Sequence, residues 1–479
     1  MLVRRPATVR YVDRLRHPDL TRLRPRRVAA VAVLTVGLIA ANGVVARGDS
    51  GFAPTPTPFA SESAGTAVGS SVLAPTSSTA PLPSAVGIAK AVGAALRAPA
   101  LGTRVGAIVT DTLTGQSLYN SNGTRSQQPA STMKLLTSLA VLSAYGPDHR
   151  LATRVARLNR SAIALVGGGD ASLVSSKAPI GISPEPAKLA TLASRTAVAL
   201  KAAGQTRVTL RFDDHLFTGP RVSPGWPPTY VSSGVVAPVS ALSVDQGRRT
   251  PTSRSRVRDP ALAAATSFAA MLNKRGVTVV GRIGRVVTVA DAAEVARVES
   301  PSLANLTERM LTYSDNDLAE ALSHLAGAAT GNGSFAGAAA ATTARLDELG
   351  IPTAGVVVSD GSGLARTDRA TAQALGAILS KASTTSSTPL WSLVTGLAVA
   401  GGTGTLSSRF DEKYTVAGRG VVRAKTGTLT SVSSLAGLVR DRDGRLLTFA
   451  VIADRRGDLL GAERALDRVA ANLARCGCR

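Results

Sequence analysis

A helix with a reactive first turn constrains this chain more than any other stretch. Residues 129–136 read Pro-Ala-Ser-Thr-Met-Lys-Leu-Leu, which places Ser131 and Lys134 three apart where an apolar helical run begins. Residues three apart share one face of a helix, so the Lys134 amine can reach the Ser131 hydroxyl. Proline before the apolar run marks a helix N-terminus, whose dipole favours negative charge developing on Ser131. The pair is a candidate nucleophile and base; the alternative is a plain helix start with a solvated lysine.

Two further short motifs carry polar groups. Ser-Asp-Asn at 314–316 lies between two expected helices, and Lys-Thr-Gly-Thr at 425–428 stands at the end of an expected strand. Only nine of the 55 basic residues are lysines, and Lys134 alone has a serine three positions before it. Each motif is short and is weak evidence alone, so the inference depends on finding all three in this order.

The charge and the cysteine count exclude two classes of partner. The net charge is +24, but residues 1–27 alone contribute nine Arg and two Asp. The other arginines are spread singly without interleaved aromatic residues, so we expect no nucleic-acid groove. The four histidines lack ligand spacing, and Cys476 and Cys478 would need further ligands. We therefore expect no metal and no other cofactor.

The N-terminal region predicts export. Residues 28–46 form an apolar run without charge that is close to the length of a membrane span, and arginines precede it. Those arginines hold the leader 1–27 in the cytoplasm, so the chain after Arg47 is extracytoplasmic. We favour a retained transmembrane anchor over a cleaved signal peptide. Residues 47–85 are rich in Pro, Ser and Thr and are expected to form a linker.

The remainder predicts a folded body of mixed helices and strands. Apolar residues at helical period indicate helices at 87–101, 187–203, 260–274, 303–311, 317–328, 336–349, 369–380 and 459–473. Alternating or short apolar runs indicate strands at 105–110, 116–119, 154–158, 163–166, 208–212, 277–289, 356–358, 421–424, 434–440 and 446–453.

The three motifs together resemble those of the penicillin-binding D-alanyl-D-alanine carboxypeptidases and endopeptidases, the low-molecular-mass penicillin-binding proteins. Further similar stretches are Leu-Val-Gly-Gly-Gly-Asp at 165–170, Asp-Gly-Ser-Gly-Leu at 360–364 and Gly-Thr-Leu at 404–406. The gap of about 180 residues between the first two motifs is also similar, because this group carries domains inserted there. The resemblance covers the chain from residue 86 to the tail.

The resemblance implies a penicillin-recognising serine transferase fold of the α+β or α/β class. Such a fold has an antiparallel sheet flanked by helices and a helical cluster, here formed by residues 86–150 and 290–479. Residues 151–289 are then an inserted α/β region. For the turn at 360–363 we expect a structural role, for Asp315 a helix cap, and for Arg366 and Arg369 surface positions.

The chemistry of acyl transfer assigns the roles. A serine hydroxyl needs a base, and Lys134 qualifies if burial and the second lysine lower its pKa. Lys425 also attracts the terminal carboxylate of the substrate, and the N–H groups of Ser131 and Thr428 are implied as the oxyanion hole. The expected catalytic residues are Ser131, Lys134 and Ser314, and the expected substrate-binding residues are Asn316, Lys425, Thr426, Gly427 and Thr428.

These assignments predict a serine-type D-Ala-D-Ala carboxypeptidase of the cell envelope. Its expected partners are peptidoglycan stem peptides, β-lactams as covalent inhibitors, and the membrane through residues 28–46, with D,D-endopeptidase activity as a possible addition. The alternatives are a β-lactamase or esterase of the same fold, and a catalytically silent scaffold that binds wall polymer. The length of the insertion argues against the first and the complete motif set against the second.

Overall fold

The computed structural model describes residues 79–177, 183–384 and 388–479. The leader 1–27, the apolar run 28–46 and nearly all of the expected linker lie outside these residues. Within the described ranges, no helix is both long and apolar enough to cross a membrane.

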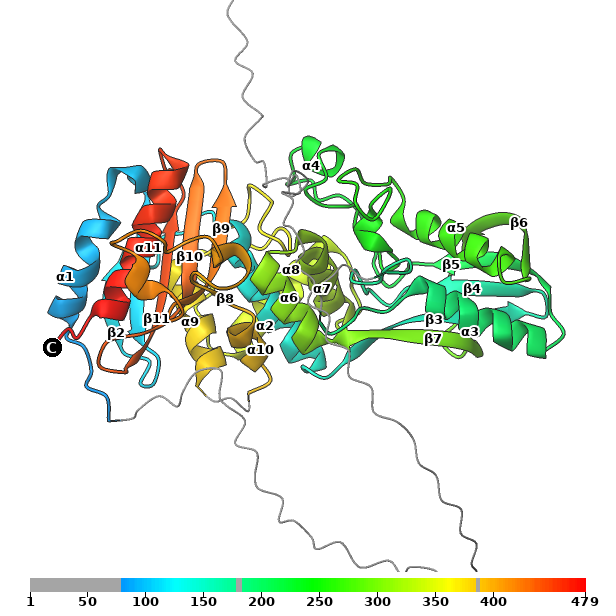
Figure 1. Cartoon of the computed structure of the whole chain (residues 1–479), viewed down its shortest axis with the longest axis horizontal. Helices are drawn as coiled ribbons and strands as arrows, with labels where there is room; N and C mark the ends of the chain where they lie inside the picture. Colours follow the sequence, from blue (N-terminus) through cyan, green and yellow to red (C-terminus); the bar gives the residue numbers. More distant parts are fainter. Residues whose placement is uncertain (1–78, 178–182, 385–387) are drawn as a thin grey trace, which may run out of the picture. The chain divides into compact units, whose positions relative to one another are not determined.

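The first sheet has six strands in the order β2-β1-β11-β10-β9-β8 and is antiparallel throughout (Figure 1). Its strands are β1 (Val105–Asp111), β2 (Ser117–Ser121), β8 (Ala398–Val399), β9 (Arg423–Leu429), β10 (Val432–Arg440) and β11 (Leu446–Ala453). Helices α1 (Ala85–Leu96) and α11 (Leu459–Arg475) cover one face, and α2 (Lys134–Tyr145) and α9 (Ala372–Ser383) pack on the other.

Strand β11 serves both layers of this core. Ala450 and Ile452 belong to the cluster shared with α2 and α9, whereas Phe449 and Val451 pack with α1 and α11. Successive side chains of a strand point to opposite faces, so the continuous apolar run of β11 fills both sides. The strand is therefore central in the sheet and fully buried.

A helical cluster adjoins the face that carries α2. It contains α6 (Leu303–Tyr313), α7 (Asn316–Ala328), α8 (Phe335–Glu348) and α10 (Trp391–Thr395). Shorter helical elements are α4 (Thr229–Ser232), η1 (Pro99–Leu101), η2 (Ala130–Met133), η3 (Asp245–Gly247), η4 (Gly404–Leu406) and η5 (Val416–Gly418). The cluster and α2 share one apolar core with the first sheet, so the motif-bearing helices are fixed against it.

The second sheet lies in the inserted region and has the order β6-β5-β4-β3-β7. Its strands are β3 (Arg150–Asn159), β4 (Ala162–Val166), β5 (Arg207–Asp213), β6 (Thr278–Arg285) and β7 (Glu294–Ser302). β4, β5 and β6 are parallel, and β3 is antiparallel to both neighbours. Helices α3 (Leu189–Ala202) and α5 (Pro260–Asn273) pack on one face. The expected fold class, an antiparallel sheet with helices plus an inserted α/β region, is confirmed.

Several boundaries differ from the sequence prediction. The first helix stops at Leu96, because Pro99 begins a separate turn. Residues 356–358 form no strand but a single bridge between Val357 and Arg369. Residues 294–302 form the unpredicted edge strand β7, whose charged side chains conceal it in the sequence. This strand pairs with β3, so the second sheet extends beyond the expected limit at residue 289.

Candidate active site

Ser131 and Lys134 meet at the junction between a tight turn and a helix. Ser131 lies in η2, whereas Lys134 is the first residue of α2, so the serine precedes the α-helix instead of starting it. Lys134 Nζ lies 3.0 Å from Ser131 Oγ. The preceding Ala130 has a φ of 50°, a left-handed conformation that is costly for a residue with a β-carbon. The predicted nucleophile and base are thus in hydrogen-bond contact at a strained turn.

Lys134 is completely buried, and its amine has two further acceptors. Nζ donates to Asn316 Oδ1 and to the Ser362 carbonyl oxygen, each at 2.8 Å. Burial lowers the pKa of Lys134 to about 8, while the carboxylates of Asp360 and Glu320, followed by those of two other aspartates, act in the opposite direction. A substantial neutral fraction of this amine therefore exists near pH 8, as a general base requires.

The 314–316 motif joins two helices beside Lys134. Ser314 ends α6 in a left-handed conformation with φ 58°. Asp315 caps α7, as predicted, since its Oδ1 accepts from the Leu318 N–H at 3.1 Å. Asn316, the first residue of α7, accepts from Lys134 and donates to the Val235 carbonyl oxygen at 3.0 Å. Its amide is therefore held in one orientation from both sides.

The 425–428 motif lies inside strand β9, not at its end as predicted. Lys425 is fully buried and donates to the Thr426 carbonyl oxygen at 2.8 Å. Burial, and then the nearby Lys134, lower the pKa of Lys425 well below its ordinary range. The expected effect of one lysine on the other thus falls mainly on Lys425, because the carboxylates lie around Lys134.

Strand β9 lies directly against the Ser131 turn. A β-carbon at Gly427 would lie 2.7 Å from the Pro129 carbonyl oxygen and 3.2 Å from the Ser131 nitrogen. Only glycine allows this approach, which brings the β9 backbone beside the candidate nucleophile. Thr426 Oγ1 donates to Thr405 Oγ1 at 2.9 Å, and Thr428 is exposed.

Residues 360–363 form the expected turn, and this turn contacts Lys134. Asp360 accepts from the N–H groups of Gly363 and Ala365, each at 2.7 Å, and from Trp226 Nε1 at 2.6 Å. A β-carbon at Gly363, where φ is 80°, would lie 1.9 Å from the Ala130 carbonyl oxygen. The backbone of this turn therefore lies against Ala130, the residue before Ser131, and the Ser362 carbonyl oxygen accepts a hydrogen bond from Lys134.

Glu320 is a site residue that the sequence did not reveal. It lies on α7, is 1% exposed, and accepts from the N–H groups of Gly361 at 3.2 Å and Ser362 at 2.8 Å. Burial, and then Asp360, raise the pKa of Glu320 to about 8. Glu320 holds the segment whose carbonyl binds Lys134. The spacing of Glu320 from Asn316, one helical turn on α7, was the available signal.

The inserted region also reaches the site, through contacts that the sequence did not reveal. Val235 supplies the carbonyl that binds Asn316. The Ala237 N–H donates to Asp317 Oδ1 at 2.7 Å, and the buried Arg256 pairs with Asp317 Oδ2 at 2.8 Å. The Gln246 amide donates to Asp315 Oδ2 at 2.6 Å. The start of α7 is thus clamped by a segment that precedes it by about 60 to 80 residues.

The site combines a half-buried serine beside a buried lysine, an asparagine on a neighbouring helix and a strand that carries a second lysine. This arrangement agrees with one protein family. The model of the D-Ala-D-Ala carboxypeptidase 3 (S13) family matches residues 88–255 and 249–473. The chain belongs to this family. The predicted family, the penicillin-binding D-Ala-D-Ala carboxypeptidases, is confirmed. The predicted enzyme class, a serine-type carboxypeptidase, is confirmed as well.

Individual relatives of this S13 carboxypeptidase agree with the family match. This chain is 37% identical over 418 residues to carboxypeptidase Rv3627c of Mycobacterium tuberculosis, and the match covers 84% of this chain and 87% of the relative. It is 36% identical over 464 residues to carboxypeptidase DacB of Mycolicibacterium smegmatis, covering 94% and 96%. Penicillin binding protein 4 of Haemophilus influenzae shares the fold, with TM-score 0.65, 19% identity, and coverage of 80% of this chain and 98% of that one.

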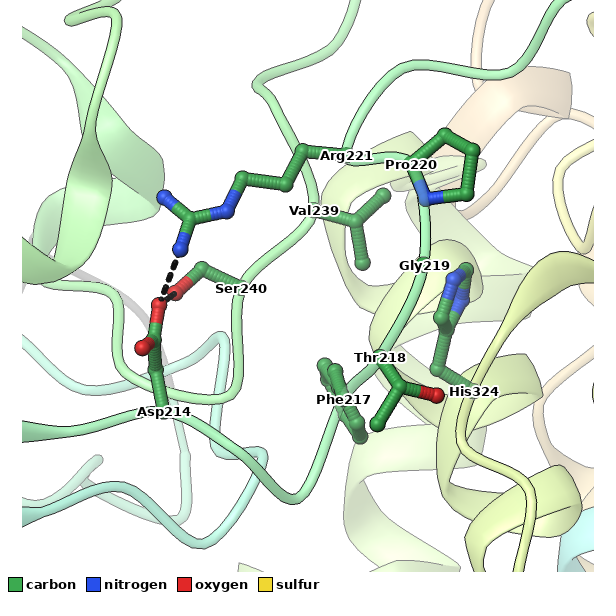
Figure 2. Close-up of a pocket in the computed structure, with 9 residues that line it drawn as sticks. All are labelled: Asp214, Phe217, Thr218, Gly219, Pro220, Arg221, Val239, Ser240 and His324. Carbon is green, nitrogen blue, oxygen red and sulfur yellow. Dashed lines mark hydrogen bonds and ion pairs between the residues drawn. The ribbon is translucent and has the colours of Figure 1, made fainter. Parts of the chain in front are cut away.

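A separate small pocket of the S13 carboxypeptidase lies between the inserted region and α7 (Figure 2). Asp214 pairs there with Arg221 at 2.6 Å, and His324 lines the opposite side. Burial lowers the pKa of His324 to about 4, so this imidazole is neutral at physiological pH. None of the predicted site residues lines this pocket, so it is distinct from the Ser131 site.

Arg366 and Arg369, predicted at the surface, are less exposed than the sequence indicated. Both are half-buried, and both donate to backbone carbonyl groups. Arg366 Nη1 binds the Thr430 carbonyl at 3.0 Å, and Arg369 Nη1 binds the Arg366 carbonyl at 2.8 Å. Arg366 thus joins the loop after the 360–363 turn to the residue that follows β9, and Arg369 braces that loop from within.

Proposed function

We propose that Ser131 is the acylating nucleophile and that Lys134 removes its proton. The observation that carries this assignment is the 3.0 Å contact between Lys134 Nζ and Ser131 Oγ at a fully buried lysine. Ser131 Oγ attacks the carbonyl carbon of the penultimate D-alanine of a peptidoglycan stem peptide. The peptide C–N bond then breaks, D-alanine leaves, and an ester to Ser131 remains.

The proposed roles of the other residues follow from where charge develops. Ser314 relays a proton to the leaving amine, and Asn316 orients Lys134 and the peptide. The N–H groups of Ser131 and Thr428 stabilise the oxyanion, an interaction in which loss of one donor typically costs about 2.7 to 4 kcal/mol. Water then hydrolyses the ester and regenerates the serine. A β-lactam forms a corresponding ester that leaves slowly.

Lys425 is proposed to bind the terminal carboxylate, together with the hydroxyls of Thr426 and Thr428 and the close approach at Gly427. A carboxylate beside Lys425 favours its charged form, and the two lysines repel one another. Binding of substrate at Lys425 therefore favours the neutral form of Lys134. In this arrangement the base becomes available when a substrate carboxylate is in place.

The proposed location is the cell envelope, with residues 28–46 as the anchor and the catalytic part, residues 86–150 and 290–479, extracytoplasmic. D,D-endopeptidase action on cross-links uses the same acyl-enzyme and is proposed as a secondary activity. Release of free D-alanine from a pentapeptide, compared with cleavage of cross-linked muropeptides, measures the balance between the two.

The decisive test is covalent labelling with a fluorescent penicillin. The wild-type protein should be labelled on Ser131, and Ser131→Ala should not be labelled because it lacks the attacking oxygen. A Ser138→Ala variant is the matched control, since this buried serine lies on α2, the helix that follows Ser131, and donates to the Lys134 carbonyl group. Labelling of Ser131→Ala at the wild-type level would overturn the assignment.

A further inference from the structure

The positive charge of the protein is concentrated in the inserted region. Residues 151–289 contain 19 Lys and Arg against 6 Asp and Glu, a net charge of +13, whereas residues 290–479 contain 20 against 19. A general bias of the chain toward arginine would affect both regions equally. The excess therefore belongs to the inserted region and is a local property of its surface.

Part of this charge forms a row on one face of the second sheet. Along β5, Val208 and Leu210 point into the core under α3 and α5, so Arg207 and Arg211 project from the opposite face. On β6, Ile283 faces that core and the preceding Arg282 does not. Figure 1 shows α5 beside β5 and β6.

The three arginines of this row are exposed, and two of them are in contact. Arg211 Nη1 donates to the Arg282 carbonyl at 3.1 Å across the two strands. Arg207 is four residues from Arg211, which corresponds to about 13 Å along a strand. Among the described residues, no ion pair includes Arg207, Arg211 or Arg282. Their guanidinium groups are available to an external anion.

The acidic residues near this row are already bound. Asp213 follows Arg211 on the same face of β5, but it is buried and accepts from the Thr288 N–H at 2.6 Å and from the His215 N–H at 2.9 Å. At the other edge of the sheet, Glu294 and Glu299 lie 3.7 and 3.5 Å from Arg297. Arg285, at the end of β6, pairs with Asp214 and Asp259 at 3.0 and 2.7 Å, so these two carboxylates are also taken. The charges of Arg207, Arg211 and Arg282 have no acidic partner among the described ion pairs.

We propose that this arginine row, Arg207, Arg211 and Arg282, binds an anionic cell-wall glycopolymer whose backbone carries phosphodiester groups. Guanidinium groups match phosphate oxygens with paired hydrogen bonds. A row on an open sheet face fits a repeating anion better than a single small ligand, which requires a concave site. The choice of a wall polymer rests on the proposed action on peptidoglycan. Binding there would hold the enzyme beside its substrate.

The test uses the full-length protein and two triple variants. Arg207→Gln/Arg211→Gln/Arg282→Gln removes the row. The control removes the same charge from the catalytic part at Lys90, Lys413 and Arg442, each to Gln, which are also exposed. The probes are poly(glycerol phosphate), cell-wall sacculi before and after removal of phosphodiester polymer, and vesicles containing phosphatidylglycerol.

The wild type and the control should bind poly(glycerol phosphate) and untreated sacculi, with affinity that falls as salt rises. The row variant should bind at least about tenfold more weakly. Equal binding by the two triple variants, undiminished binding to stripped sacculi, or tighter binding of the row to vesicles than to the polymer would overturn the proposal.

Penicillin labelling of the same samples separates this proposal from the proposed function. The row variant should be labelled at the wild-type rate, because none of its three residues contacts the Ser131 site. Absent labelling of the wild type would reject the catalytic assignment while polymer binding could still be measured. Weak labelling of the row variant alone would show that the substitutions disturb the fold, and single Arg207→Gln and Arg282→Gln variants then repeat the test.

Discussion

The two sheets hold their positive charge in opposite ways. Beside and within the first sheet, Lys134 and Lys425 are fully buried, and burial lowers the pKa of each. On the second sheet, Arg207 and Arg211 are exposed, and a guanidinium stays charged at any physiological pH. The buried lysines can therefore exchange protons near physiological pH, whereas the exposed arginines stay charged and can only attract anions.

Arg256 is the instructive exception. It belongs to the inserted region, yet it is 8% exposed and pairs with Asp317 at the start of α7. Burial lowers the pKa of Arg256, and burial also raises the pKa of Asp317 to about 6. This arginine therefore belongs energetically with the catalytic site, and it identifies the part of the insertion that the site needs.

The largest effect should come from removing a buried cation of the first sheet. Lys134→Met keeps an apolar chain of similar length but removes the base, so the rate of penicillin labelling should fall about 10²- to 10⁴-fold. Stopped-flow or gel-based labelling measures this rate. Lys413→Met, at an exposed lysine, should leave the rate unchanged. If Lys134→Met were labelled at the wild-type rate, the proposed difference in role between buried and exposed lysines would be wrong.

The next largest effect is expected at Arg256, the buried arginine of the inserted region. Arg256→Met leaves Asp317 buried without its partner, and such broken pairs typically cost about 3 to 5 kcal/mol of unfolding free energy. The nearby exposed Arg254→Met should be nearly neutral. Denaturant unfolding measures both variants.

A double variant sharpens this result. Arg256→Met/Asp317→Asn removes the unpaired charge and should recover part of the loss. If Arg256→Met were as stable as Arg254→Met, the inserted region would have no energetic part in the site.

The smallest effect is a pH dependence. In the proposed mechanism the neutral amine of Lys134 accepts the proton of Ser131, and raising the pH increases the neutral fraction of this amine. With a pKa of about 8, the labelling rate should rise about tenfold between about pH 7 and about pH 9. The groups that oppose this deprotonation are, in order, Asp360, Glu320, Asp315 and Asp317. A rise centred near 10.5, the ordinary value for lysine, would contradict the role given to burial.

Residues with a distinctive side chain could be placed from the sequence. Ser131, Lys134 and Asn316 were predicted together, and the structure brings them into direct hydrogen-bond contact. Their roles remain predictions. Among the described hydrogen bonds, none involves the Ser314 hydroxyl, the proposed proton relay.

The supporting contacts could not be predicted, for two physical reasons. Val235 and Ser362 act through backbone carbonyl groups, which leave no signal in the residue type. Glu320 and Arg256 act only because the fold buries them beside partners distant in sequence. The extent of β9 was also underestimated, since Thr426 and Gly427 do not look like strand residues until β10 pairs with them.

The two connections of the second sheet run side by side into the catalytic part. β3 leaves after α2, and β7 returns into α6 at Ser302, which pairs with Arg150. Two backbone hydrogen bonds hold this junction together. The Leu303 N–H donates to the His149 carbonyl oxygen and the Ala304 N–H to the Pro147 carbonyl oxygen, each at 2.8 Å. The two covalent connections of the second sheet therefore enter the catalytic body at one two-stranded stem, between the helix that follows Ser131 and the helix that ends at Ser314. The inserted region thus grips that body twice, at this stem and at the start of α7.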